Sequence, residues 1–107
     1  MTGFGEREKG FERKFQHDQE LQFKVMARRN KLLGQWAAEK LGLSGDAAET
    51  YAKTVVAADF EKPGDDDVLQ KVLADLTAKG LQVTDHGVRK EMDRLLGVAK
   101  EQIAKTV

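Results

Sequence analysis

Apolar residues recur at steps of three and four along most of this 107-residue chain. That spacing places them on one face of an α-helix, whereas a half-buried strand would show strict alternation. The clearest stripe lies near the C-terminus and consists of Val88, Met92, Leu95, Leu96, Ala99, Ile103 and Val107. With only one proline in the chain, the pattern predicts an all-α fold whose helices turn their apolar faces toward a shared core.

Signals that start and stop helices divide the chain into four such segments. The expected N-caps are Ser44, Asp65 and Thr84, and the expected stops are Gly42, Pro63 and Gly80. The first segment is the longest, and its apolar face runs from Leu21 to Leu41. We therefore expect a four-helix bundle with a long first helix.

The first twenty residues differ in character from the rest. Phe4, Phe11 and Phe15 lie at offsets of zero, seven and eleven, which aligns them along one helical face. The remainder is mostly charged, and Gly10 costs about 1 kcal/mol of helix stability relative to Ala. We expect residues 1–20 to form a mobile or conditionally helical N-terminal arm, followed by a helical bundle domain at residues 21–107.

Two surfaces could bind the phenylalanine stripe of this arm. One is the protein's own bundle, with the rings extending the core face of the first helix. The other is a groove on a partner protein, in the manner of an amphipathic helix laid into an apolar cleft. Gly3, Gly5 and the lack of apolar residues between Phe4 and Phe11 favour the partner.

The sequence offers no set of residues that could perform catalysis, so we expect that the protein is not an enzyme. His17 and His86 are far apart, no cysteine is present, and no phosphate-binding loop or metal motif occurs. We accordingly expect no catalytic residue, no metal and no cofactor.

The balance of charge limits the partners. Eighteen basic residues offset eighteen acidic ones, whereas nucleic acids and anionic membranes attract an excess of Lys and Arg. No segment approaches the ~20 apolar residues of a membrane helix. We expect a cytoplasmic protein, a monomer when free, that binds neither nucleic acid nor the membrane interior.

One basic cluster invites a second hypothesis. Arg28, Arg29 and Lys31 could bind an anion, a nucleotide phosphate or an acidic partner, or they could simply form the solvated side of the first helix. Weak binding of ATP or ADP would follow from the first reading. Trp36 and Tyr51 are expected to be core aromatics with their polar atoms near the rim.

Several stretches together resemble the zeta subunit of alphaproteobacterial F-type ATP synthases. In the first half they are Arg7-Glu8-Lys9, Phe11-Glu12, Lys14-Phe15, His17-Asp18, Phe23-Lys24, Ala27-Arg28-Arg29-Asn30-Lys31-Leu32-Leu33-Gly34 and Trp36-Ala37-Ala38-Glu39. In the second half they are Tyr51-Ala52, Ala58-Asp59-Phe60, Pro63-Gly64-Asp65 and Thr84-Asp85-His86. The resemblance covers essentially the whole chain.

The resemblance implies a four-helix protein that inhibits ATP hydrolysis by the catalytic head of the synthase. The N-terminal segment would enter an interface between an alpha and a beta subunit and reach toward the gamma shaft, while the globular part stays outside. By position, the apolar anchors would be Phe4, Phe11 and Phe15, and the charged contacts would be Arg7, Lys9, Arg13 and Lys14. The protein would then lie on the cytoplasmic side of the membrane-bound enzyme.

Two other functions remain open at this point. A small helical regulator could bind a nucleotide or another anion through Arg28, Arg29 and Lys31, and the family has been associated with weak nucleotide binding. A helical adaptor with a different protein partner would fit the same composition.

Overall fold

Four helices form the part of the chain that the computed structural model describes, residues 2–61 and 65–106. They are α1 (Thr2–Lys40), α2 (Gly45–Glu61), α3 (Asp65–Ala78) and α4 (Asp85–Thr106). Side chains are described for residues 19–59 and 65–106. The predicted all-α class and the long first helix are confirmed, and no strand occurs within the described ranges.

The core is built from apolar side chains of all four helices. Its buried members are Leu33, Ala37, Val55, Val68, Leu69, Val72, Leu76, Val88, Met92 and Leu95. Fully burying a side chain such as Leu or Val stabilises the fold by about 1.5–3 kcal/mol relative to leaving it exposed. The stripe predicted near the C-terminus is the core face of α4, where Ala99 and Ile103 are also buried.

Two of the predicted stop signals, Gly42 and Gly80, lie at turns between helices, and the third, Pro63, lies outside the described residues. Gly42 has a φ of +80°, and the Leu43 amide donates to the Ala38 carbonyl at 2.9 Å, which closes the end of α1. Gly80 has a φ of +91°, and the Leu81 amide donates to Leu76 in the same pattern at 3.1 Å.

The starts of the helices agree with the expected caps to within one residue. Thr84 caps α4, because its hydroxyl accepts a hydrogen bond from the Gly87 amide at 3.0 Å. Helix α2 begins directly after Ser44, and α3 begins at Asp65 itself.

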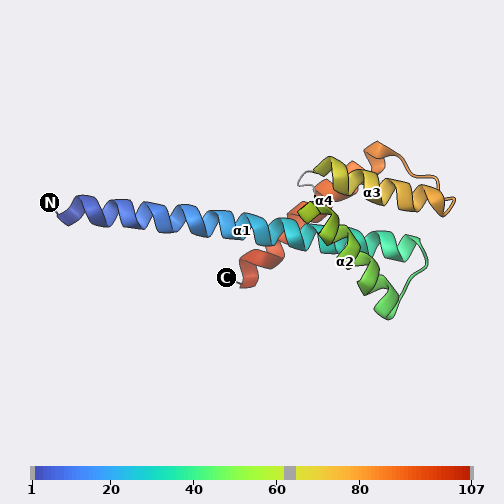
Figure 1. Cartoon of the computed structure of the whole chain (residues 1–107), viewed down its shortest axis with the longest axis horizontal. Coiled ribbons are helices and arrows are strands. Elements are labelled where there is room, and N and C mark those ends of the chain that lie inside the picture. Colours follow the sequence, from blue (N-terminus) through green and yellow to red (C-terminus); the bar gives the residue numbers. More distant parts are fainter. Residues whose placement is uncertain (1, 62–64, 107) are drawn as a thin grey trace.

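One helix gives the molecule its elongated shape. The extents are 66 × 25 × 23 Å, and α1, with 39 residues, is ~58 Å long at 1.5 Å per residue. Figure 1 shows α2, α3 and α4 gathered around the C-terminal half of α1, while its N-terminal half extends away from them. No helix in the described residues is long and apolar enough to span a bilayer.

Candidate partner-binding surface

The projecting half of α1 carries the residues predicted to bind a partner. Their backbone is helical from Thr2 onward and continuous with the part of α1 that packs in the bundle. Their side chains lie outside the described ones; these residues are Phe4, Arg7, Lys9, Phe11, Arg13, Lys14 and Phe15. Beyond the arm, Leu21 of α1 lines a shallow hollow together with Leu96 of α4. The partner-binding role of the arm stays a prediction.

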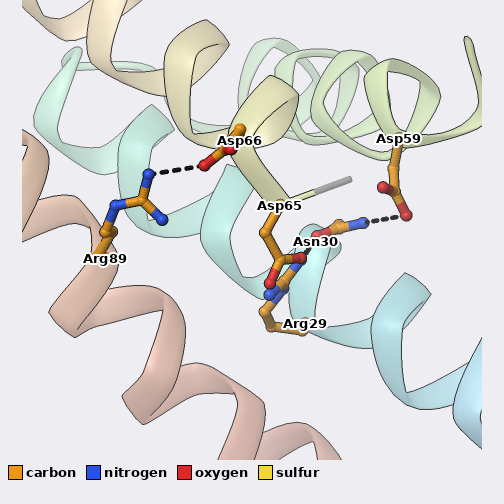
Figure 2. A network of polar contacts seen from close by, with 6 residues as sticks. All are labelled: Arg29, Asn30, Asp59, Asp65, Asp66 and Arg89. Carbon is orange, nitrogen blue, oxygen red and sulfur yellow. Dashed lines mark hydrogen bonds and ion pairs between the residues drawn. The ribbon is translucent and has the colours of Figure 1, made fainter. Parts of the chain in front are cut away.

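A buried arginine fixes α1 within the bundle. Arg29 is only 2% exposed, and its Nη2 donates to Asp65 Oδ1 at the start of α3 over 2.8 Å. Its Nε and Nη2 also donate to Asn30 Oδ1, at 3.0 and 2.9 Å. A buried charge needs such partners because burial removes its hydration. Figure 2 shows the guanidinium reaching from α1 toward the first turn of α3.

The same network reaches α2 and α4. Asn30, which is also buried, donates from Nδ2 to Asp59 Oδ2 on α2 at 3.2 Å. On the surface, Arg89 of α4 donates to Asp66 at 2.7 Å (Figure 2) and to Asp85 at 2.8 Å. These hydrogen bonds, to Asp66 first and Asp85 second, raise the pKa of Arg89 above its ordinary value. The buried contacts therefore hold α1 against α2 and α3, while Arg89 joins α4 to α3.

The structure separates Arg29 from the other two cations of the basic cluster, Arg28 and Lys31, which line one hollow. Successive helical residues point ~100° apart, so Arg29 turns into the bundle and is bound by Asp65. Arg28 points toward α4, where its Nη1 donates to Gln102 Oε1 at 3.4 Å, and Lys31 is exposed beside α2. Arg29 is thus engaged by a carboxylate of the bundle, and the anion-binding role of the three residues stays a prediction.

A signal for the buried network was present in the sequence. Arg29 and Asn30 precede Leu33 by four and three residues, and Leu33 and Ala37 lie on the core face. Helical periodicity alone therefore puts Arg29 and Asn30 on the buried side of α1. Charge considered without this periodicity groups Arg29 with Arg28 and Lys31.

Trp36 and Tyr51 both pack against the core, as expected. Tyr51 is partly buried against the core, and its hydroxyl donates to Asp75 Oδ2 at 2.8 Å. Burial, this hydrogen bond and the negative charge of Asp75 together raise the pKa of Tyr51 above its usual value. Trp36 packs against the core, with the Lys40 ammonium 5.2 Å from its ring centre.

The bundle holds no arrangement typical of a catalytic or metal site among its described residues. No group of three or more His, Asp or Glu side chains there could hold a metal ion. His86 is exposed, and His17 lies outside the described side chains. The polar groups that do converge, around Arg29, hold helices together.

Comparison with known proteins points in one direction. The family model described as ATPase inhibitor subunit zeta matches residues 1–102. A structure solved in solution by NMR shares 49% sequence identity, covers 81% of this chain and 99% of its own, and superposes with a TM-score of 0.71. No curated protein matches the chain.

Proposed function

The chain belongs to the ATPase inhibitor subunit zeta family, and from that premise we propose that it is an inhibitory subunit of the F-type ATP synthase that acts through its N-terminal arm. The arm would enter an interface between an alpha and a beta subunit of the catalytic head, on the cytoplasmic side, and approach the gamma subunit. There it would block ATP hydrolysis, while the bundle remains outside the interface.

The projection of α1 is the observation that carries this proposal. Residues 2–20 extend ~28 Å at 1.5 Å per residue, on the end of α1 that points away from the bundle (Figure 1). A helix that enters a cleft between two subunits needs such a free length. The arm also carries three phenylalanines on one face, which suits the apolar groove that a helix-in-groove contact requires.

The charged composition of the arm favours its binding as a helix in a groove of a partner protein. Arg7, Lys9, Arg13 and Lys14 surround the phenylalanines in sequence and alternate with carboxylates. Such a helix buries little apolar surface because its apolar face is narrow, and it is only marginally stable when isolated. We infer that the arm acquires its full stability only when a partner receives the rings.

The decisive test replaces Phe11 and Phe15 with alanine in the full chain. We expect inhibition of ATP hydrolysis by the purified catalytic head to weaken at least about tenfold, because loss of an apolar anchor at an interface costs about 1–2 kcal/mol or more per residue. The melting temperature should change little, since the arm extends beyond the core.

A matched control separates inhibition from folding. Leu33→Ala removes a fully buried core side chain and should lower the free energy of unfolding by about 2–5 kcal/mol. At a temperature where this variant remains folded, it should still inhibit. If the double phenylalanine variant instead lost stability and inhibited normally, the rings would belong to the protein's own core and the proposal would be wrong.

A further inference from the structure

Two hollows on the outer face of α1 and α2 meet to form one furrow. The first, of about 530 Å³, lies between α1, α2 and the end of α4, and its apolar lining includes Phe23, Ala27, Val56 and Ile103. The second, of about 430 Å³, continues between α1 and α2 over Ala52, Val56 and Ala57. Both are lined by Lys31 and Val56, so the two hollows adjoin, and together they are called the furrow.

The rim of the furrow is strongly basic. Its cations are Lys24, Arg28, Lys31 and Lys53, and its carboxylate is Glu49. The whole chain has a net charge of zero, so this excess of positive charge is local. Phe23, at one end, is 58% exposed, which is unusual for so large an apolar side chain in this bundle. An apolar floor with a charged rim is the usual anatomy of a protein-binding surface.

The length of the furrow suits a short helix. Phe23 to Gln35 covers twelve steps along α1, or ~18 Å at 1.5 Å per residue, which is about three helical turns. Lys24, Arg28 and Lys31 follow one another at steps of four and three, so they form one row along α1. Carboxylates at the same steps on a partner helix would face this row.

We propose that the furrow docks an acidic amphipathic helix, about three turns long, on the outside of the catalytic head. This contact would anchor the bundle while the arm inserts, and it rests on the proposed function. The rim pairs would mainly speed association and fix the register, because exposed ion pairs contribute little affinity each. The apolar floor would supply most of the affinity.

Two other occupants fit the furrow less well. A second copy related by two-fold symmetry would bring the same cations face to face, and like charges repel. The protein's own arm continues the helix whose side lines the furrow, and α1 runs straight away from it (Figure 1). An acidic partner is the occupant that both charge and geometry favour.

The test reverses two rim charges in the full chain. Lys24→Glu with Lys31→Glu should raise the concentration needed for half-maximal inhibition of the purified head about tenfold or more, since the reversed charges would face the partner's carboxylates and repel them. Raising the salt concentration should reduce the difference in half-maximal inhibitory concentration between this variant and the unaltered protein, because salt screens exposed charges. The matched control is Lys79→Glu with Lys90→Glu, which makes the same change of charge at exposed positions outside the furrow.

The outcomes separate the two proposals. If the unaltered protein fails to inhibit the head, the proposed function is wrong. If the unaltered protein inhibits and the rim variant matches the control pair, the docking furrow alone is wrong. Melting curves for all proteins establish that each variant is folded under the assay conditions.

A cross-linking experiment identifies the occupant. The chain contains no cysteine, so Ala57→Cys gives a single attachment point within the furrow for a photoreactive group. We expect cross-links from the full-length protein to a carboxylate-rich helix of the purified head, and none from Lys90→Cys. Cross-links to a second copy of the chain would overturn the proposal. Inorganic tripolyphosphate, added at constant ionic strength, could abolish the cross-link and leave inhibition unchanged. That result would show that the furrow binds small anions, and it would also overturn the proposal.

Discussion

Gly34 lies where α1 crosses α2, and its missing side chain sets how closely the two helices approach. A Cβ added there would be 2.6 Å from the Ala52 Cα, which is backbone and cannot move aside without moving α2. Overpacking of this kind costs about 1–3 kcal/mol. We therefore expect Gly34→Ala to lower the free energy of unfolding by that amount, as measured by urea denaturation.

Gly97 provides the matched control for Gly34. It also lies inside a helix, but no atom would come within 4 Å of an added Cβ. Gly97→Ala should therefore stabilise the protein by about 0.4–1 kcal/mol, because alanine restricts the unfolded chain. Equal effects of the two substitutions would show that the helices do not touch at Gly34.

Tyr51 makes stability depend on alkaline pH. Its pKa in the folded protein is raised by burial, by the hydrogen bond to Asp75 and by the charge of that carboxylate. A raised folded pKa gives stability that is complete below the unfolded value of about 10 and is lost as pH rises through the folded value. We expect the free energy of unfolding to fall above about pH 10, and to fall less steeply in Tyr51→Phe.

The titration of Tyr51 can be observed directly because it is the single tyrosine of the chain. Tyrosinate absorbance in the native protein should appear at higher pH than in the protein unfolded by denaturant. Coincident titration curves would contradict the hydrogen bond between Tyr51 and Asp75.

At the scale of helices and turns, local chemistry predicted much of what the structure shows. Left-handed glycines stop α1 and α3, and a threonine caps α4, since each satisfies backbone groups within a few residues. The start of α1 was harder to predict from local chemistry. The weak, charged sequence of the arm predicted a conditionally helical segment at residues 1–20; the backbone of residues 2–20 is helical and continues into the rest of α1, and the division at residue 20 stays a prediction.

Contacts between distant segments were harder to predict than caps. The pairing of Arg29 with Asp65 joins residues 36 positions apart, and that of Asn30 with Asp59 joins residues 29 apart. Periodicity places Arg29 and Asn30 on the core face, but only the packing of α1 on α2 and α3 determines which carboxylates meet them. The furrow likewise depends on three helices and has no signature in any one of them.

At the scale of the whole molecule, the continuity of α1 joins the arm to the bundle. The network around Arg29 fixes α1 against α2 and α3, and the unbroken helix transmits that direction to the arm. A loosely tethered arm would have to search for its cleft and would lose more conformational freedom on binding. If the arm acts as proposed, the bundle would aim it as well as hold it.

Breaking α1 between the arm and the bundle tests whether direction matters. Gln19 is exposed and precedes Leu21, which lines a hollow together with Leu96 of α4. Gln19→Pro removes a helical hydrogen bond and clashes with the preceding turn, which kinks a helix at a cost of about 3 kcal/mol. We expect inhibition of the catalytic head to weaken although every proposed contact residue is intact, while Gln19→Ala inhibits normally. The melting temperature of the bundle should stay nearly unchanged, because the disrupted turn lies on the arm's side of residue 19. Full inhibition by the proline variant would show that the arm works as a tether whose direction the bundle does not set.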